Sequence, residues 1–194
     1  MNTEELNALK DRAHKTAVEH GFYEDIQSDA YYLGIVMSDM GKAIDADRNG
    51  RHANTEGFTD FMESEKFYFR LAFDSYIKGS VEEKLADIVI RLLDFAMFKE
   101  YTLHVEAKAS YSLNSNDALL KFEESGLPSM LFYLMDILTA AYGWNELQTG
   151  VYELISILSD CFKNITGSDR DLWWFVERKI GYNEVKPKFD GEIY

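Results

Sequence analysis

Two acid–lysine pairs in the sequence could place charged side chains around one ligand. Lys42 follows Asp39 by three positions in the stretch GIVMSDMGKAIDADRNGRH, and Asp87 follows Lys84 by three positions in SVEEKLADIVIRLLDFA. Residues three apart lie on one face of a helix, so each pair would present a carboxylate and an ammonium group side by side. Such a pattern fits either a solvated helix face or a remnant of a site that binds charged ligands.

The simpler interpretation treats these residues as surface charges. On a helix over 80–98, the charged residues Lys84, Asp87, Arg91 and Asp94 lie opposite a stripe of apolar residues. An exposed helix stabilised by ion pairs has this pattern. Asp39 and Lys42 could likewise pair with each other or with the second stretch, and the residue types alone leave both interpretations open.

A third stretch, DLWWFVERKIGYNEVKP at 171–187, places Lys179 among apolar positions of a helix. The apolar positions are Leu172, Phe175, Val176 and Ile180. A lysine there must extend to solvent, pair with an acid or face a pocket. Tyr182, Asn183 and Lys186 follow directly. Tyrosine and asparagine can stack on or hydrogen-bond a base, but they can equally end a helix.

Periodic apolar residues and only two prolines predict an all-α protein. We expect helices at about 3–20, 29–48, 58–78, 80–98, 129–142, 147–164 and 169–181. Ser80 and Glu83 form a capping-box pattern at the start of the fourth helix. No segment resembles a linker, so residues 1–194 are expected to form one domain.

Charge and composition narrow the class of function. The net charge of −14 disfavours binding to nucleic acid polymers and anionic membranes, because such binding depends on Lys and Arg. The single cysteine, Cys161, allows no intramolecular disulfide, and no apolar run reaches the roughly 18 residues of a membrane span. We therefore expect a cytoplasmic protein, whose partner could be a small anionic ligand if a local basic pocket exists.

The three stretches together resemble the MazG-like, all-α nucleoside triphosphate pyrophosphohydrolases. SDMGKAIDADRNGRH is similar to the family pattern S-E-L-x-E-A-L-E-A-D-R-x-G-R, and SVEEKLADIVIRLLD to V-E-D-E-L-A-D-x-x-I-R-x-L-D. The tail GYNEVKP is similar to K-x-x-Y-N-x-x-R-P. The resemblance implies a helical bundle in which residues 100–168 are an inserted helical region, and it implies a homodimer.

The resemblance also implies a metal site that is degenerate in this chain. In the family, carboxylates on two helices hold magnesium, and the enzymes split a nucleoside triphosphate into the monophosphate and pyrophosphate. The four ligand positions correspond here to Asp39, Lys42, Lys84 and Asp87. Asp39 and Asp87 are then the remnant catalytic and metal-binding residues, with Glu83 as a possible further ligand if capping does not occupy it.

The leading interpretation is therefore a protein that binds a nucleotide or another phosphorylated ligand, with weak or absent magnesium-dependent hydrolysis. The expected ligand-binding residues are Lys42, Lys84, Lys179, Tyr182, Asn183 and Lys186. No cofactor is expected, and magnesium would be needed only by an active enzyme. Two alternatives stay open: an active pyrophosphohydrolase that uses displaced carboxylates, and a non-catalytic structural or assembly partner.

Overall fold

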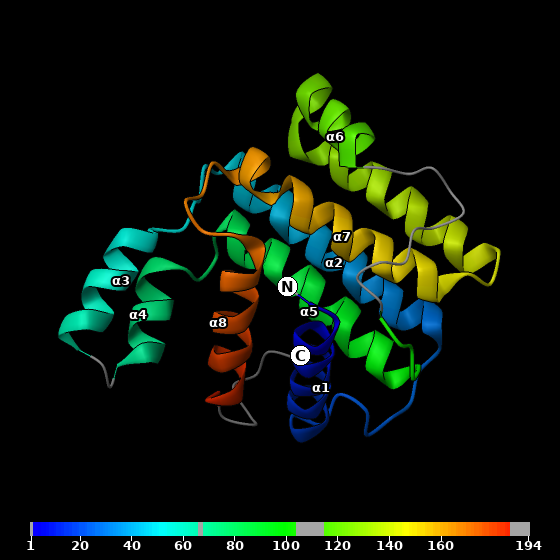
Figure 1. Ribbon diagram of the computed structural model, residues 1–194, viewed down its shortest axis with the longest axis horizontal. Coiled ribbons are helices and arrows are strands. Elements are labelled where there is room, and N and C mark those ends of the chain that lie inside the picture. The colour runs from blue at the N-terminus through cyan, green and yellow to red at the C-terminus, as the bar shows by residue number, and fades with distance from the viewer. Residues whose placement is uncertain (1, 66–67, 104–114, 187–194) are drawn as a thin grey trace.

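The computed structural model describes residues 2–65, 68–103 and 115–186, and these residues form eight helices and no strand (Figure 1). The helices are α1 Thr3–Glu19, α2 Asp29–Arg48, α3 Thr55–Ser64, α4 Phe69–Tyr76, α5 Val81–Phe98, α6 Ser115–Gly143, α7 Leu147–Thr166 and α8 Leu172–Glu184. The described part of the chain is one all-helical body, which confirms the predicted all-α class.

The central element of the bundle is α5. It packs against α1, α2, α7 and α8, while α6 lies outside it on α7 and α2. Figure 1 shows α3 and α4 side by side at one end of the molecule, where α4 reaches α8. Helices from both ends of the sequence therefore enclose the segment that carries the second acid–lysine pair.

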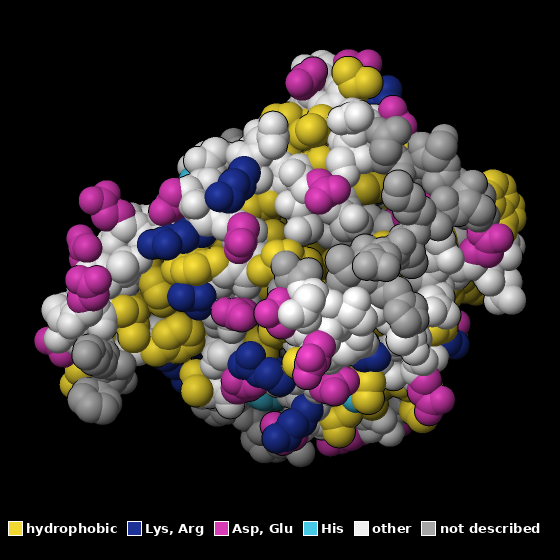
Figure 2. All heavy atoms as spheres, viewed as in Figure 1, with side chains coloured by type: hydrophobic (Ala, Val, Ile, Leu, Met, Phe, Trp, Pro, Cys, Tyr) yellow, Lys and Arg dark blue, Asp and Glu magenta, His cyan; other side chains and the backbone are white. Residues whose placement is uncertain are grey.

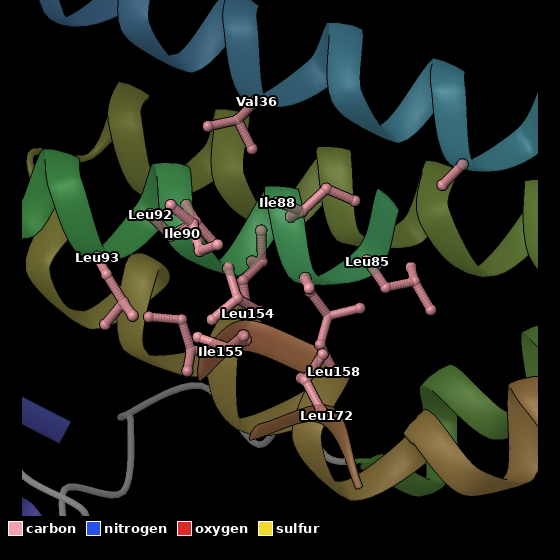
Figure 3. Packing of buried hydrophobic residues seen from close by; sticks show 14 of the residues in the cluster. Val36, Leu85, Ile88, Ile90, Leu92, Leu93, Leu154, Ile155, Leu158 and Leu172 are labelled. Carbon is pink, nitrogen blue, oxygen red and sulfur yellow. The ribbon is translucent and has the colours of Figure 1, made fainter. Parts of the chain in front are cut away.

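The sequence of α5 explains its central place. Its apolar residues are not confined to one stripe, and Leu85, Ile88, Leu92 and Leu93 are completely buried. Figure 3 shows Val36 of α2 on one side of α5 and side chains of α7 on the other. Complete burial of one such side chain contributes about 1.5–3 kcal/mol, so this packing dominates the stability of the bundle.

The polar residues of α5 do not form the exposed face that a solvated helix would have. Asp94 is buried, and the side chains of Asp87 and Arg91 are each only 17% exposed. The interpretation as an exposed ion-pair face is therefore wrong for this helix. The reason is that α1, α2 and α8 cover the sides that the local pattern leaves for solvent.

Several element boundaries differ from those predicted. The helix expected at 58–78 is the pair α3 and α4, and the side chain of Asn54 caps the first of them. The last helix continues past Gly181 to Glu184. The predicted inserted region at 100–168 contains α6 and α7, and its residues 104–114 lie outside the described part of the chain.

The helix predicted at 129–142 is the second half of α6. Within α6, Ser125 and Gly126 have non-helical backbone angles, and Gly126 has a φ of 77°. Pro128 lies two residues later, in the first turn of the second half, where a proline is tolerated because the N–H it lacks has no helical partner there. The kink at Gly126 therefore explains why the sequence predicted the start of a helix near this position.

Hydrophobic side chains gather between the α3–α4 pair and α8 on the face that Figure 2 shows. The ring of Phe58 in α3 meets Trp174 of α8 edge to face, with 5.5 Å between ring centroids. The guanidinium of Arg178 lies 3.8 Å from the centroid of the same indole. The ring contact therefore holds α3 against α8.

Candidate functional site

Both predicted acid–lysine pairs are formed in the structure. The Nζ atom of Lys42 lies 2.7 Å from Oδ1 of Asp39, and that of Lys84 lies 3.1 Å from Oδ2 of Asp87. In the first pair, the Asp39 side chain is only 5% exposed whereas that of Lys42 is 58% exposed. The carboxylate therefore points into the bundle and the ammonium group points outward.

Arg91 of α5 connects the two pairs. Its Nε atom lies 3.5 Å from Oδ2 of Asp39, and its charge also helps to lower the pKa of Asp87. We define the charged cluster by its seven members, Asp39, Lys42, Glu83, Lys84, Asp87, Arg91 and Lys179. The structure thus brings the acid–lysine pairs of α2 and α5 into one region.

Lys179 of α8 pairs with acids. Of the three alternatives for this lysine, which were extension to solvent, pairing with an acid and facing a pocket, the structure shows the second. Its Nζ atom hydrogen-bonds Glu83 and lies 3.3 Å from Oδ1 of Asp87. Burial alone would lower the pKa of Lys179, but the charges of Asp87 and Glu83 outweigh it and raise the pKa above its ordinary value. Lys179 is therefore a charged, buried partner of two carboxylates.

The same electrostatic argument applies to Asp87. Burial would raise its pKa, but the charges of Lys179 and Lys84 outweigh this effect and hold the pKa below its ordinary value. Asp87 is therefore ionised at neutral pH. Its two oxygens are already bonded to ammonium groups, Oδ1 to Lys179 and Oδ2 to Lys84.

Glu83 combines capping with ion pairing. The backbone N–H of Glu83 donates to Oγ of Ser80 at 3.1 Å, as the capping-box pattern predicts. Its own carboxylate accepts from the backbone N–H of Gly79 at 2.6 Å, and not from that of Ser80 as a full capping box would, and it contacts Lys84 and Lys179. Both oxygens are thus engaged, which leaves Glu83 poorly suited as the further metal ligand that the sequence suggested.

A pocket of about 390 Å³ opens beside the charged cluster. Its walls come from α2, the turn that follows α2, the turn that precedes α5, and α5 itself. The lining residues are Ser38, Gly41, Lys42, Asp45, Arg51, Gly79 and Lys84. Lys42 and Lys84, which the sequence proposed as ligand-binding residues, therefore lie on the walls of the same pocket.

The turn after α2 places Arg51 at this pocket. Gly50 has a φ of 61°, and the N–H groups of Gly50 and Arg51 donate to the carbonyls of Asp47 and Ala46 at 2.9 and 3.0 Å. This is the Schellman arrangement, which ends a helix and reverses the chain. The Arg51 side chain then hydrogen-bonds Asp45 on the last turns of α2.

A buried carboxylate fixes this turn against α5. The Oε1 atom of Glu82 lies 3.0 Å from Nδ1 of His52. Its Oε2 atom accepts a hydrogen bond from the backbone N–H of Ala53 at 2.9 Å. The N–H of Val81 also donates to the carbonyl of Arg51 at 2.9 Å. The first turn of α5 therefore holds the backbone at Arg51 and at the two residues that follow it.

The ligand-binding residues that the sequence predicts after Gly181 do not line the pocket. Tyr182 and Asn183 are buried in α8, and the ring of Tyr182 stacks on Phe73 at 4.4 Å while its hydroxyl donates to Asp74 at 2.7 Å. Lys186 is half-buried beyond the end of α8. None of these three predicted ligand-binding residues is among those that line the pocket.

Sequence reasoning missed Arg51, Asp45 and Ser38 as site residues. A signal for Arg51 was present, because an Asn-Gly pair directly after a helix predicts a chain reversal that carries the next residue back over the helix end. Asp45 lies four residues after Gly41 on α2, so the helical repeat places it on the same wall.

The arrangement offers hydrogen-bond donors at the pocket. Within the ranges that the structure describes, no group of three or more His, Cys, Asp or Glu side chains is suited to a metal ion. Asp39 and Asp87, the remnant ligands of the resemblance, both bond to cationic side chains. Three cationic residues reach the pocket instead, and their N–H groups suit a phosphate.

Comparisons with known proteins assign no family to this chain, because no protein-family model, curated protein or solved structure matches it. The pocket and the charged cluster beside it are therefore the features from which a function can be inferred. Across the described ranges, the helices are too short or too polar for any of them to traverse a lipid bilayer.

Proposed function

We propose that the protein binds a small phosphorylated ligand, such as a nucleotide, in this pocket, and that its magnesium-dependent hydrolysis is weak or absent. The observation that carries the proposal is the convergence of Lys42, Arg51 and Lys84 on one pocket in a chain of net charge −14. Three cations from different elements at one place supply both charge and N–H donors for phosphate oxygens.

The carboxylates nearby do not cancel this charge. The pocket and the charged cluster together hold five cations, Lys42, Arg51, Lys84, Arg91 and Lys179, and four carboxylates, Asp39, Asp45, Glu83 and Asp87. An ammonium group has three N–H donors and a guanidinium has five, so each pocket cation keeps donors beyond those its acid partner uses. The carboxylates thus orient the cations, and N–H donors remain for a ligand.

The resemblance to MazG-like pyrophosphohydrolases adds a rationale for the lack of hydrolysis. Magnesium requires several oxygen ligands, and an ammonium group cannot coordinate it. Two of the four ligand positions are Lys42 and Lys84, and the two that remain, Asp39 and Asp87, bond to cations. We therefore propose a degenerate member of that scaffold in which fixed cations take over the electrostatic role of the metal.

Calorimetry with ATP and AMP in the presence of EDTA tests the proposal. The wild type should bind at least one of them with an affinity that EDTA does not change. Lys42→Met and Arg51→Gln should each weaken binding at least tenfold, because both residues lose a contact to phosphate. Lys15→Met, which removes an exposed lysine of α1 outside the pocket, is the control and should bind like the wild type.

Two outcomes would overturn the proposal. Equal affinity in the wild type and both pocket variants would place the ligand elsewhere, and no binding of any phosphorylated probe would remove the function itself. A pyrophosphate-release assay with magnesium should give only background rates, whereas rapid release would favour the active-enzyme alternative. Light scattering tests the homodimer that the resemblance implies.

A further inference from the structure

The pocket lacks the surfaces that usually recognise a nucleobase. Its lining consists of two glycines, one serine, one aspartate and three cationic residues, without an aromatic or aliphatic side chain. Proteins bind bases mainly by stacking them on aromatic rings or guanidinium planes and by hydrogen bonds to their edges. Apart from Arg51, nothing in the lining offers a flat face for stacking.

Tyr182 and Trp174 of α8 are already engaged in other contacts. Tyr182 is only 2% exposed, stacks on Phe73 and donates its hydroxyl proton to Asp74. Trp174 is covered by Arg178 and packs edge to face on Phe58. Moving either ring into the pocket would break these contacts, so neither is available as a platform for a base.

Asp45 supplies a hydrogen-bond acceptor to the pocket, whereas the three cations supply donors. Its side chain is 67% exposed on the pocket wall, among three cations. A carboxylate repels phosphate but accepts hydrogen bonds from hydroxyl groups, and Ser38 on the same wall can donate or accept. A wall that carries cations, a carboxylate and a hydroxyl matches a ligand that carries both phosphate and hydroxyl groups.

We propose that the ligand belongs to the class of sugar phosphates and that the pocket does not recognise a nucleobase. Lys42, Arg51 and Lys84 bind the phosphate, and Asp45 and Ser38 bind sugar hydroxyls. The volume of about 390 Å³ is near the lower end of ligand pockets, which span about 300–1,000 Å³, and suits such a compact ligand. This inference rests on the proposed function and specifies its ligand.

A comparison of ribose 5-phosphate with AMP tests this inference, because the two share the phosphate and the pentose and differ by the adenine. Calorimetry should give affinities within fivefold of each other, and inorganic phosphate should bind at least fivefold more weakly than ribose 5-phosphate. An AMP affinity more than fivefold above that of ribose 5-phosphate would overturn the inference and leave the proposed function intact. Absence of binding by both compounds would overturn the inference, and absence of ATP binding as well would overturn the proposed function.

The variant Asp45→Ala separates recognition of the sugar from recognition of the phosphate. It should weaken ribose 5-phosphate at least fivefold while leaving inorganic phosphate unchanged or tighter, because a repulsive carboxylate is removed. Asp47→Ala on the same helix, outside the pocket lining, is the matched control and should change neither affinity. An equal loss of both affinities in Asp45→Ala would show that Asp45 acts only by holding Arg51, which would overturn its role in sugar recognition.

Discussion

The Nζ atom of Lys179 lies 3.3 Å from Oδ1 of Asp87, so the last helix supplies a cation to a carboxylate of the central helix. Lys84 takes the other oxygen of Asp87 at 3.1 Å. Ammonium groups from α5 and α8 therefore bond to both oxygens of this carboxylate.

The first prediction concerns the stability that this contact provides. Lys179→Met should lower the free energy of unfolding by about 3–5 kcal/mol, because it leaves Glu83 and Asp87 buried with fewer cationic partners. Urea denaturation at pH 7 measures the change. Lys15→Met removes a lysine whose side chain is 75% exposed and should cost less than about 1 kcal/mol.

A double variant provides a further check on the same contact. Lys179→Met combined with Asp87→Asn should be less destabilised than the sum of the two single variants, because the second change removes a charge that the first leaves unpaired. Additive losses, or a loss below about 1 kcal/mol in Lys179→Met alone, would mean that the pair contributes little to stability.

Much of the fold could be predicted from local sequence. The apolar repeats located most helices, and Ser80 marked the start of α5 correctly. The enclosure of α5 could not be predicted, because it depends on α1 and α8, which come from distant parts of the chain. A polar position such as Asp94 looks exposed on a helical wheel but becomes buried once such helices pack on it.

The site could be predicted only in part, because local spacing sets some of its contacts and the folding of distant segments sets the others. Spacing along one helix paired Asp39 with Lys42 and Lys84 with Asp87, since local geometry sets those contacts. Arg51 was missed because its place depends on the left-handed backbone at Gly50. The assignment of Tyr182 and Asn183 to a ligand came from the resemblance, and in the structure α8 continues past Gly181 and buries both.

The second prediction uses Gly41 to fill the pocket. A Cβ atom at this position would meet no atom within 4 Å, so a larger side chain enters open space in the pocket wall. Gly41→Leu should weaken binding of ribose 5-phosphate at least tenfold. It should also raise the free energy of unfolding by about 0.5–1 kcal/mol, because leucine favours a helix more than glycine does.

Gly34 provides a matched control for this change. It lies two turns earlier on the same face of α2, is equally open around its Cβ position, and does not line the pocket. Gly34→Leu should give the same gain in stability without a loss of binding. Unchanged binding in Gly41→Leu would place the ligand outside this pocket.

The third prediction concerns pH. Burial, assisted by the charge of Glu146, raises the pKa of Glu153 in α7 to about 7, and neither carboxylate oxygen has a hydrogen-bond partner among the described residues. A carboxyl group with a raised pKa stabilises the fold fully below its unfolded pKa, near 4.3, and loses this contribution as the pH rises through the folded pKa. The protein should therefore lose stability between about pH 5 and pH 8.

Glu153→Gln should remove most of this loss. Between pH 5 and pH 8, the free energy of unfolding of the wild type should fall by on the order of 2 kcal/mol more than that of the variant. The comparison across pH cancels the constant cost of burying the amide. Glu123→Gln, at an exposed position of α6, is the control and should follow the wild type. Parallel pH profiles for Glu153→Gln and the wild type would show that Glu153 does not titrate in this range.

The fourth prediction concerns magnesium. The triple variant Asp39→Glu, Lys42→Glu and Lys84→Glu restores carboxylates at all four positions that the resemblance assigns to the metal. At an effective dielectric constant near 20, a unit charge about 4 Å from a like charge is disfavoured by about 4 kcal/mol, and a divalent ion by more. Replacing two ammonium groups should therefore permit magnesium binding, although Arg91 and Lys179 remain nearby and limit its affinity.

Thermal denaturation with and without magnesium measures this effect. The triple variant should be less stable than the wild type without metal, because its carboxylates repel one another. Magnesium at several millimolar should raise its melting temperature, since a ligand that binds only the folded state stabilises it. The wild type should show no such shift. Lys42→Gln combined with Lys84→Gln removes the cations without adding ligands and should respond much less than the triple variant. If magnesium leaves the melting temperature of the triple variant unchanged, the four positions do not surround a common metal site in this chain.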